Sequence, residues 1–249
     1  MPKRQRRDEQ SRPFFLRDLR LKNDSQEHYV SLLKESTITL AIGPAGTGKT
    51  FIAAYVALSM LLGGEVDRII LCRPIVATED IGYLPGTADE KIHPYIMPLV
   101  DAIEVHIGPT KTRDFFENLQ LEALPLAYMR GRSLNRSVII LDEAQNTTAS
   151  QMKMFLTRLG YGSKMFVSGD ITQSDLPGTE RDRNGLKIAV EKLRGIDEQI
   201  SVMEFYAKDI VRHPLIEKIA GRLDLNVRPN NSVIMKEPTS TRVFNFEHR

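Results

Sequence analysis

The stretch Gly43-Pro44-Ala45-Gly46-Thr47-Gly48-Lys49-Thr50 decides the fold class of this chain. It satisfies the pattern GxxxxGK[ST], it follows the apolar run 37–42, and it leads into the apolar segment 51–62. A buried strand, a glycine-rich turn and a helix in this order are typical of a phosphate-binding loop. Glycines let such a loop turn its backbone N–H groups toward an oxyanion, and the start of the helix adds partial positive charge. The sequence therefore predicts a site for a nucleoside triphosphate.

Individual residues of this loop have predicted roles. Lys49 is expected to reach the β- and γ-phosphates, and the hydroxyl of Thr50 is expected to ligate Mg²⁺. The remaining six residues are expected to surround the phosphates with their backbone: Gly43, Pro44, Ala45, Gly46, Thr47 and Gly48. A chance glycine-rich turn is the alternative, and the matching strand, motif and helix argue against it.

Short apolar segments alternate with helical patterns along the chain. Strands are predicted at 38–42, 68–72, 137–141, 164–168 and 200–205. Helices are predicted at 25–35, 50–62, 148–159 and 185–194. Alternation of this kind predicts an α/β fold, in which a mostly parallel sheet has helices on both faces.

Two acidic residues follow the strand predicted at 137–141. Asp142 and Glu143 are expected at the carboxyl edge of the sheet, where open α/β sheets bind their ligands. Asp142 is expected to hold Mg²⁺ through water, and Glu143 is expected to polarise the attacking water. The alternative is that both acids only cap the next helix. The phosphate-binding loop earlier in the chain favours the catalytic interpretation.

The next predicted strand ends in a second polar segment, 169–173, with the letters GDITQ. Together, DEAQ at 142–145 and this GDxxQ resemble motifs II and III of superfamily 1 helicases, and by that resemblance Gln173 senses the γ-phosphate. Gln26 resembles the adenine-reading glutamine of that superfamily, with Tyr29 as a stacking partner, although an ordinary exposed helix glutamine is the alternative. Arg73-Pro74 resembles the nucleic-acid-contacting motif Ia, and a plain strand-end turn explains it equally well.

The sequence resembles the PhoH-like family over about residues 26–223. The segments that carry the resemblance are GPAGTGKT (43–50), LCRPIV (71–76), YLPGTADEKIHPYIMPLVDAI (83–103), YMRGRSLNRSVIILDEAQNTT (128–148), QMKMFLTRLGYGSKMFVSGDITQSDLPG (151–178) and DIVRHPLIEKI (209–219). The resemblance implies a P-loop ATPase with one RecA-like domain, ATP and Mg²⁺ as cofactors, and a role in RNA metabolism.

Three regions are predicted along the chain: a basic arm at 1–20, the ATPase domain at 21–228 and a tail at 229–249. Many relatives carry an additional amino-terminal domain, and some are fused to a PIN ribonuclease domain. The short arm has room for neither, so we expect no ribonuclease activity from this chain.

A processive helicase has a second RecA-like domain that supplies an arginine finger, and too few residues follow Asp175 to form one. We therefore expect a homo-oligomer, a hexameric ring by the resemblance, in which a neighbouring subunit supplies the finger. Arg212 in DIVRHP is the first candidate, and Arg222 is the second. The alternative is a surface arginine paired with an acid such as Asp209 or Glu217.

Composition leaves the partner open. The 34 Lys and Arg exceed the 32 Asp and Glu by 34 − 32 = 2, so a nucleic-acid surface would have to be local. Basic residues gather near Tyr128, and they form either a single-strand groove or solvated faces: Lys111, Arg113, Arg130, Arg132, Arg136, Lys153, Arg158 and Lys164.

Three function classes remain after these observations. The first is an ATPase acting on RNA or single-stranded DNA. The second is an ATPase switch acting on protein partners, and the third is a small-molecule kinase, for which the sequence has no lid rich in arginine. We expect a cytoplasmic protein without a membrane span, because no apolar run is long enough and Cys72 is the single cysteine.

Overall fold

The computed structural model describes residues 16–75 and 88–211, together with 215, 216, 219 and 222; the side chains of 88–93 lie outside this description. The chain divides into two compact units, Met1–Val211 and Arg212–Arg249. Of the second unit, the described residues are helical. Most of the predicted arm, the predicted domain boundary at 228 and the tail lie outside the described residues.

Six strands form one sheet in the first unit, in the order β3-β2-β4-β5-β1-β6. The strands are β1 (Ile38–Ile42), β2 (Arg68–Arg73), β3 (Leu121–Pro125), β4 (Ser137–Leu141), β5 (Lys164–Gly169) and β6 (Ile200–Glu204). Each neighbouring pair of these strands is parallel. The strand that precedes the phosphate-binding loop therefore lies beside β5, and β4 lies on the other side of β5.

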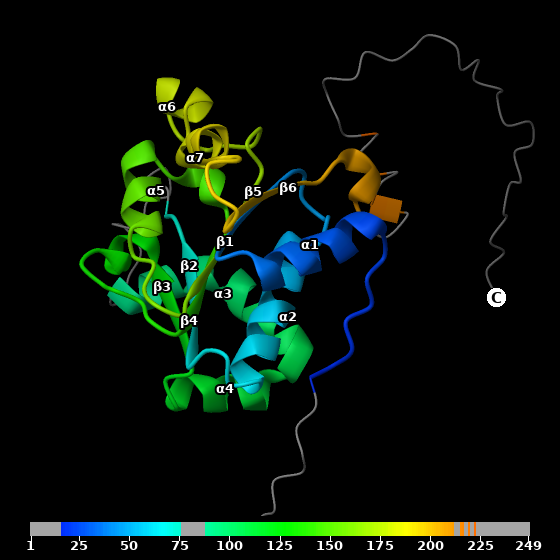
Figure 1. Cartoon of the computed structure of the whole chain (residues 1–249), viewed down its shortest axis with the longest axis vertical. Helices are drawn as coiled ribbons and strands as arrows, with labels where there is room; N and C mark the ends of the chain where they lie inside the picture. The colour runs from blue at the N-terminus through cyan, green and yellow to red at the C-terminus, as the bar shows by residue number, and fades with distance from the viewer. Residues whose placement is uncertain (1–15, 76–87, 212–214, 217–218, 220–221, 223–249) are drawn as a thin grey trace, which may run out of the picture. The chain divides into compact units, whose positions relative to one another are not determined.

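Helices cover both faces of this sheet (Figure 1). One face packs against α1 (Asp24–Glu35), α2 (Lys49–Leu62), α3 (Ala88–Ile107) and α4 (Pro109–Glu117). The other face packs against α5 (Ala149–Leu156) and α7 (Gly185–Leu193), and the short α6 (Thr179–Asp182) lies between them in sequence. The arrangement is the α/β P-loop NTPase fold, which confirms the predicted fold class.

Alternating side chains of the strands fill two separate cores. In β2, Ile69 and Leu71 face the core under α2 and α3, whereas Ile70 and Cys72 face the core under α5 and α7. This division follows from the two-residue period of a strand. Cys72 is buried as predicted, and its burial raises the pKa of the thiol. Leu16 and Leu19, at the end of the predicted arm, pack against the first core.

Most predicted elements agree with the structure to within one or two residues, and one helix ends earlier than predicted. The helices α3, α4 and α6 were not predicted. Helix α5 ends at Leu156 rather than 159, because Leu134 pairs with Leu159 and its N–H donates to the carbonyl of Arg158 at 3.1 Å. Strand β3 was not predicted. It is an edge strand with Glu122 and Pro125 in it, so it lacks a continuous apolar run. In the described residues, no helix combines the length and the apolar character that a membrane crossing needs.

Candidate nucleotide-binding site

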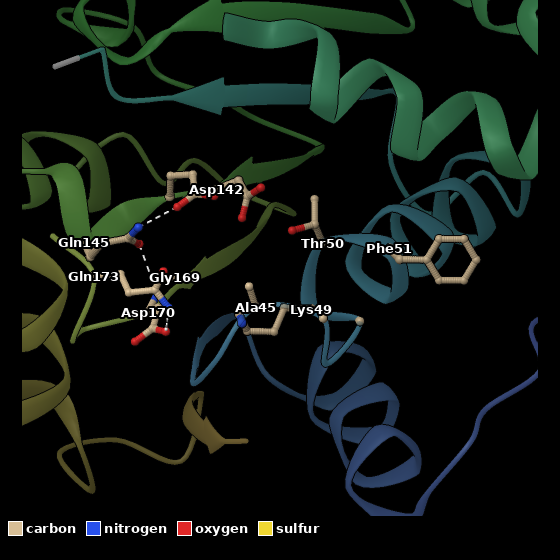
Figure 2. Close-up of a pocket in the computed structure, with 12 residues that line it drawn as sticks. Ala45, Lys49, Thr50, Phe51, Asp142, Gln145, Gly169, Asp170 and Gln173 are labelled. Carbon is tan, nitrogen blue, oxygen red and sulfur yellow. Dashed lines mark hydrogen bonds between the residues drawn. The ribbon is translucent and has the colours of Figure 1, made fainter. Parts of the chain in front are cut away.

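A cavity of about 310 Å³ lies at the carboxyl ends of β1, β4 and β5 (Figure 2). It is lined by Ala45, Gly46, Gly48, Lys49, Thr50, Phe51, Asp142, Glu143, Gln145, Gly169, Asp170 and Gln173. The residues come from three segments that are far apart in the sequence, and the parallel sheet brings their strand ends together. Cavities of this size and mixed polarity hold small-molecule ligands.

The first glycine of the phosphate-binding loop is required by a close approach of two backbones. Gly43 has a φ of 136°, and a Cβ on it would lie 2.3 Å from the carbonyl oxygen of Phe205, just after β6. Its N–H donates to the carbonyl of Gly169 at 3.2 Å, which joins the loop to the end of β5. The loop is therefore fixed from both neighbouring strands.

The second half of the loop leaves backbone donors open. Gly48 has a φ of 90° and is the N-cap of α2, without a side-chain capping bond. Among the described residues, no protein group accepts a hydrogen bond from the backbone N–H groups of residues 46–50. Free N–H groups at the N-terminus of a helix attract anions. This part of the loop therefore fits a phosphate.

Lys49 is the cation of the site. Its Nζ donates to the carbonyls of Gly43 at 2.7 Å and Pro44 at 2.8 Å, and the side chain is buried. Burial lowers the pKa of Lys49, whereas the negative charges of Asp142, Asp170 and Glu143 act in the opposite direction. An anion beside this ammonium would offset the cost of its burial, so the ammonium also fits a phosphate.

Asp142 and Thr50 supply oxygen atoms to the same space. Figure 2 shows their oxygens pointing toward each other across the cavity. The hydroxyl of Ser168 donates to Oδ1 of Asp142 at 2.7 Å, which fixes the carboxylate. The described residues hold no group of three or more His, Cys, Asp or Glu side chains able to bind a metal. A hydroxyl and one carboxylate fit Mg²⁺, which retains waters and shares the oxygens of phosphates.

Glu143 follows Asp142 in an unusual backbone conformation. Its φ of 52° and ψ of 37° are left-handed, and it makes no side-chain capping bond to η3 (Ala144–Asn146). The capping alternative is therefore wrong for Glu143. Its carboxylate is held by two neighbours instead: Nη2 of Arg73 lies 3.7 Å from Oε1, and Nε2 of Gln145 donates to Oε2.

The loop after β5 brings Gln173 to the same cavity. Asp170 organises this loop, since its Oδ1 accepts from the N–H and hydroxyl of Thr172 and its Oδ2 accepts from Nε2 of Gln173 at 2.6 Å. Gln173 and Lys49 both line the cavity, as their predicted roles require. The sensing of a γ-phosphate by Gln173 stays a prediction.

Gln26 lies beside the phosphate-binding loop rather than on an exposed face. Its side chain is only 5% exposed, so the alternative of an ordinary surface glutamine is wrong. Nε2 donates to the carbonyl of Thr47 at 3.0 Å, and Oε1 accepts from the N–H of Lys22 at 2.9 Å. The sequence did not predict this hydrogen bond to Thr47, because it joins α1 to the phosphate-binding loop, which are separate in the sequence.

A second cavity, of about 320 Å³, adjoins the loop on the side of Gln26. It is lined by Leu19, Arg20, Lys22, Gln26, Gly46, Gly48, Phe51, Ile52 and Val211, and Gly46, Gly48 and Phe51 line both cavities. Tyr29 is fully buried and packs edge-on against Phe205 at 5.4 Å between ring centroids. The prediction that Tyr29 stacks on a base is therefore wrong.

The basic residues predicted as one group are divided by the structure. Arg136 pairs with Asp67, and Lys164 donates to the carbonyls of Lys34 and Ser36; both basic residues lie at the amino ends of strands. Arg132 pairs with Glu122, Lys111 pairs with Asp114, and Arg158 donates to backbone carbonyls. These contacts hold several of the basic side chains locally, and nucleic-acid binding by the group stays a prediction. Tyr128 and Arg130 remain exposed after β3, around the end of η2 (Leu126–Met129).

The two candidate arginine fingers belong to the second unit. Arg212 lies outside the described residues, and Arg222 is described as exposed. Asp209, suggested as a partner of Arg212, is buried and accepts from the hydroxyl of Ser25 at 2.7 Å and the N–H of Tyr206 at 2.8 Å. Both oxygens of Asp209 therefore have partners within the first unit.

Comparison with known proteins agrees with this geometry. The family model described as PhoH-like protein matches residues 18–224. The chain belongs to the PhoH-like family. A "PhoH-like protein" of Bacillus subtilis (strain 168) is 48% identical over 209 residues, which are 84% of this chain and 65% of the relative. Another "PhoH-like protein", of Mycobacterium bovis, is 51% identical over 202 residues, which are 81% of this chain and 56% of the relative.

The matched part of this PhoH-like chain thus spans between about half and two thirds of the length of these relatives. Among solved structures, the chain is similar to the "Sulfolobus solfataricus SWI2/SNF2 ATPase core in complex with dsDNA" with a TM-score of 0.43 and 14% identity. That similarity covers 64% of this chain and 33% of the other, and it is too weak to bear on activity.

Proposed function

We propose that this PhoH-like chain binds ATP with Mg²⁺ in the cavity at the carboxyl edge of the sheet and hydrolyses the γ-phosphate. One observation carries the proposal: Lys49, Thr50, Asp142 and Glu143 line a single cavity, although three different segments supply the lining. Phosphoryl transfer depends on positioning and charge neutralisation, and these four side chains supply both.

Each residue has a distinct part in the proposed reaction. The open N–H groups of residues 46–50 and the Lys49 ammonium bind the β- and γ-phosphates. Thr50 and Asp142 hold Mg²⁺, which neutralises charge that develops on the phosphate oxygens. Glu143 orients and polarises the attacking water, and Gln173 contacts the γ-phosphate from the neighbouring loop.

The base of the nucleotide is proposed to occupy the second cavity. Leu19, Ile52 and Val211 give this cavity apolar walls, and it shares Gly46 and Gly48 with the phosphate cavity. Gln26 is the polar side chain placed to read adenine there. Its hydrogen bond to Thr47 also links any movement of Gln26 to the phosphate-binding loop.

A nucleic-acid role is proposed for the neighbouring part of the carboxyl edge. Arg73 ends β2, and the exposed Tyr128 and Arg130 follow β3, which pairs with β2. An aromatic ring with arginines suits single-stranded RNA or DNA, because bases stack and phosphates pair with guanidinium groups. The alternative is an ATPase switch that acts on a protein partner and ignores polynucleotide.

The active assembly is proposed to be a homo-oligomeric ring, with Arg212 as an arginine finger from the adjacent subunit. The proposal rests on the sequence position of Arg212 in the family segment 209–219. Within the described residues, no arginine lines the phosphate cavity. A finger from outside would complete the charge compensation in the transition state.

The test is the rate of ATP hydrolysis by the whole chain, with and without Mg²⁺ and with RNA, single-stranded DNA or neither. We expect Mg²⁺-dependent turnover that polynucleotide raises severalfold. Turnover that ignores both polynucleotides would favour the protein-directed switch. No turnover under any condition, despite tight ATP binding, would refute hydrolysis as the function.

A further inference from the structure

Gln145 occupies a position between the two catalytic segments of the cavity. It belongs to η3, directly after Glu143, and its side chain is only 2% exposed. Its Nε2 donates to Oε2 of Glu143, and its Oε1 accepts from the backbone N–H of Asp170 at 3.0 Å. One amide group therefore joins the carboxylate after β4 to the loop after β5 (Figure 2).

The rest of the structure fixes this amide in place. The backbone carbonyl of Gln145 accepts from the hydroxyl of Ser174 at 2.9 Å, which holds the residue itself. A Cβ on Gly169 would lie 2.4 Å from Oε1 of Gln145, so the glycine leaves room for the side chain. A buried side-chain amide whose oxygen and nitrogen are both hydrogen-bonded has little freedom to rotate, since a flip of the amide would leave buried polar groups unpaired.

Glu143 needs such a restraint for two reasons. Its carboxylate is partly exposed, and its other neighbour, Arg73, lies at the long distance of 3.7 Å. Its left-handed backbone is strained, and such a conformation persists only where the surrounding structure holds it. A catalytic carboxylate that is displaced by about 1 Å can lose roughly 10²-fold in rate.

We propose that Gln145 is the positioning residue for Glu143, and that it couples the orientation of Glu143 to the loop carrying Asp170 and Gln173. Gln173 lines the cavity and donates to Asp170, whose N–H is the group bonded to Gln145. A γ-phosphate that moves Gln173 therefore acts on Glu143 through Asp170 and Gln145. The proposal deepens the proposed ATPase function and rests on it.

The chain supplies a matched control in the next residue. Asn146 has the same pair of bonds with a different partner: Nδ2 donates to Oδ2 of Asp175 at 2.9 Å, and Oδ1 accepts from the N–H of Asp175 at 2.8 Å. Asn146 does not line the cavity. Both side chains connect η3 to the loop after β5, but of the two only the Gln145 side chain donates to the carboxylate of Glu143.

The test compares Gln145→Glu with Asn146→Asp in the full chain. In each variant, one side-chain oxygen can still accept from the backbone N–H of the loop after β5. The amide nitrogen that donated to a carboxylate is replaced by a carboxylate oxygen, which places two carboxylates side by side. We expect Gln145→Glu to lower kcat roughly 10²-fold while the Kd for ATP stays within about threefold. Asn146→Asp is expected to keep kcat within about threefold at a similar loss of Tm. Gln145→Asn, which adds no charge but is too short to span both partners, should also lower kcat.

A double variant separates positioning from direct catalysis. If Gln145 acts only through Glu143, adding Gln145→Glu to Glu143→Gln should lower the residual rate no further. A further loss of tenfold or more would overturn the proposal, as would equal losses of kcat in Gln145→Glu and Asn146→Asp. If the wild type hydrolyses ATP and the Gln145 variants do so at the same rate, the positioning role alone is refuted. A wild-type chain without turnover refutes the proposed function and the positioning role together.

Discussion

Replacing Gly43 by alanine tests whether the phosphate-binding loop is fixed by its approach to the end of β6. The new Cβ would lie 2.3 Å from the Phe205 carbonyl oxygen and 2.9 Å from two further atoms of that residue. Backbone atoms cannot rotate away, so β1 and β6 must separate where Phe205 donates to Ile42 at 2.8 Å. Overpacking of this kind costs about 1–3 kcal/mol, and the positive φ adds roughly 1–2 kcal/mol.

The expected loss for Gly43→Ala is therefore about 2–5 kcal/mol of unfolding free energy, or roughly 4–20 °C in Tm for a chain of this size. Gly64→Ala is the matched control, because Gly64 also has a positive φ, of 73°, but no atom lies within 4 Å of its Cβ position. It should lose about 1 kcal/mol. Chemical denaturation of both variants measures the difference. Equal losses would refute the idea that the close approach to Phe205 fixes the loop.

Three further substitutions test the site itself. Lys49→Ala should weaken ATP binding at least tenfold, about 1.4 kcal/mol, in calorimetry, because the phosphates lose their nearest cation; unchanged affinity would contradict the assignment. Ser168→Ala removes the hydroxyl that fixes Asp142, so the Mg²⁺ concentration for half-maximal turnover should rise severalfold; an unaltered Mg²⁺ titration would remove Asp142 from the metal site. Arg212→Ala should lower turnover at unchanged ATP affinity, and mixing it with Lys49→Ala should restore activity if Arg212 acts on the neighbouring subunit. Absence of recovery in cross-linked mixed rings would place Arg212 elsewhere.

The central strands could be predicted because each is buried on both faces and therefore apolar throughout. Strands β1 and β4 begin and end at the predicted residues. The edge strand β3 could not be predicted in the same way, because it contains the charged residue Glu122. The carboxylate of Glu122 is accommodated there by ion pairs with Arg68 and Arg132. Those partners come from β2 and from the segment before β4, and local sequence does not reveal such pairs.

The same distinction decides which residues of the site could be predicted. The phosphate-binding loop, Asp142 and Glu143 follow strands directly, so a short motif locates them. The contacts of Gln26 and Gln145 depend on the adjacency of different elements: α1 against the loop, and β4 against β5. The letters DEAQ contain Gln145, and they were the available signal for it. Its partner Asp170 becomes evident only once the strand order is known.

Single-turnover hydrolysis by Glu143→Gln is the most direct test of ATP hydrolysis at this site. The amide keeps the size of the side chain but polarises water poorly, so ATP affinity should stay within about threefold while the rate falls roughly 10²- to 10⁴-fold. Glu191→Gln, the same change at an exposed position of α7, should match the wild type in both measurements. A Glu143→Gln rate within about threefold of the wild type would contradict the assignment of Glu143 and, with it, the proposed mechanism.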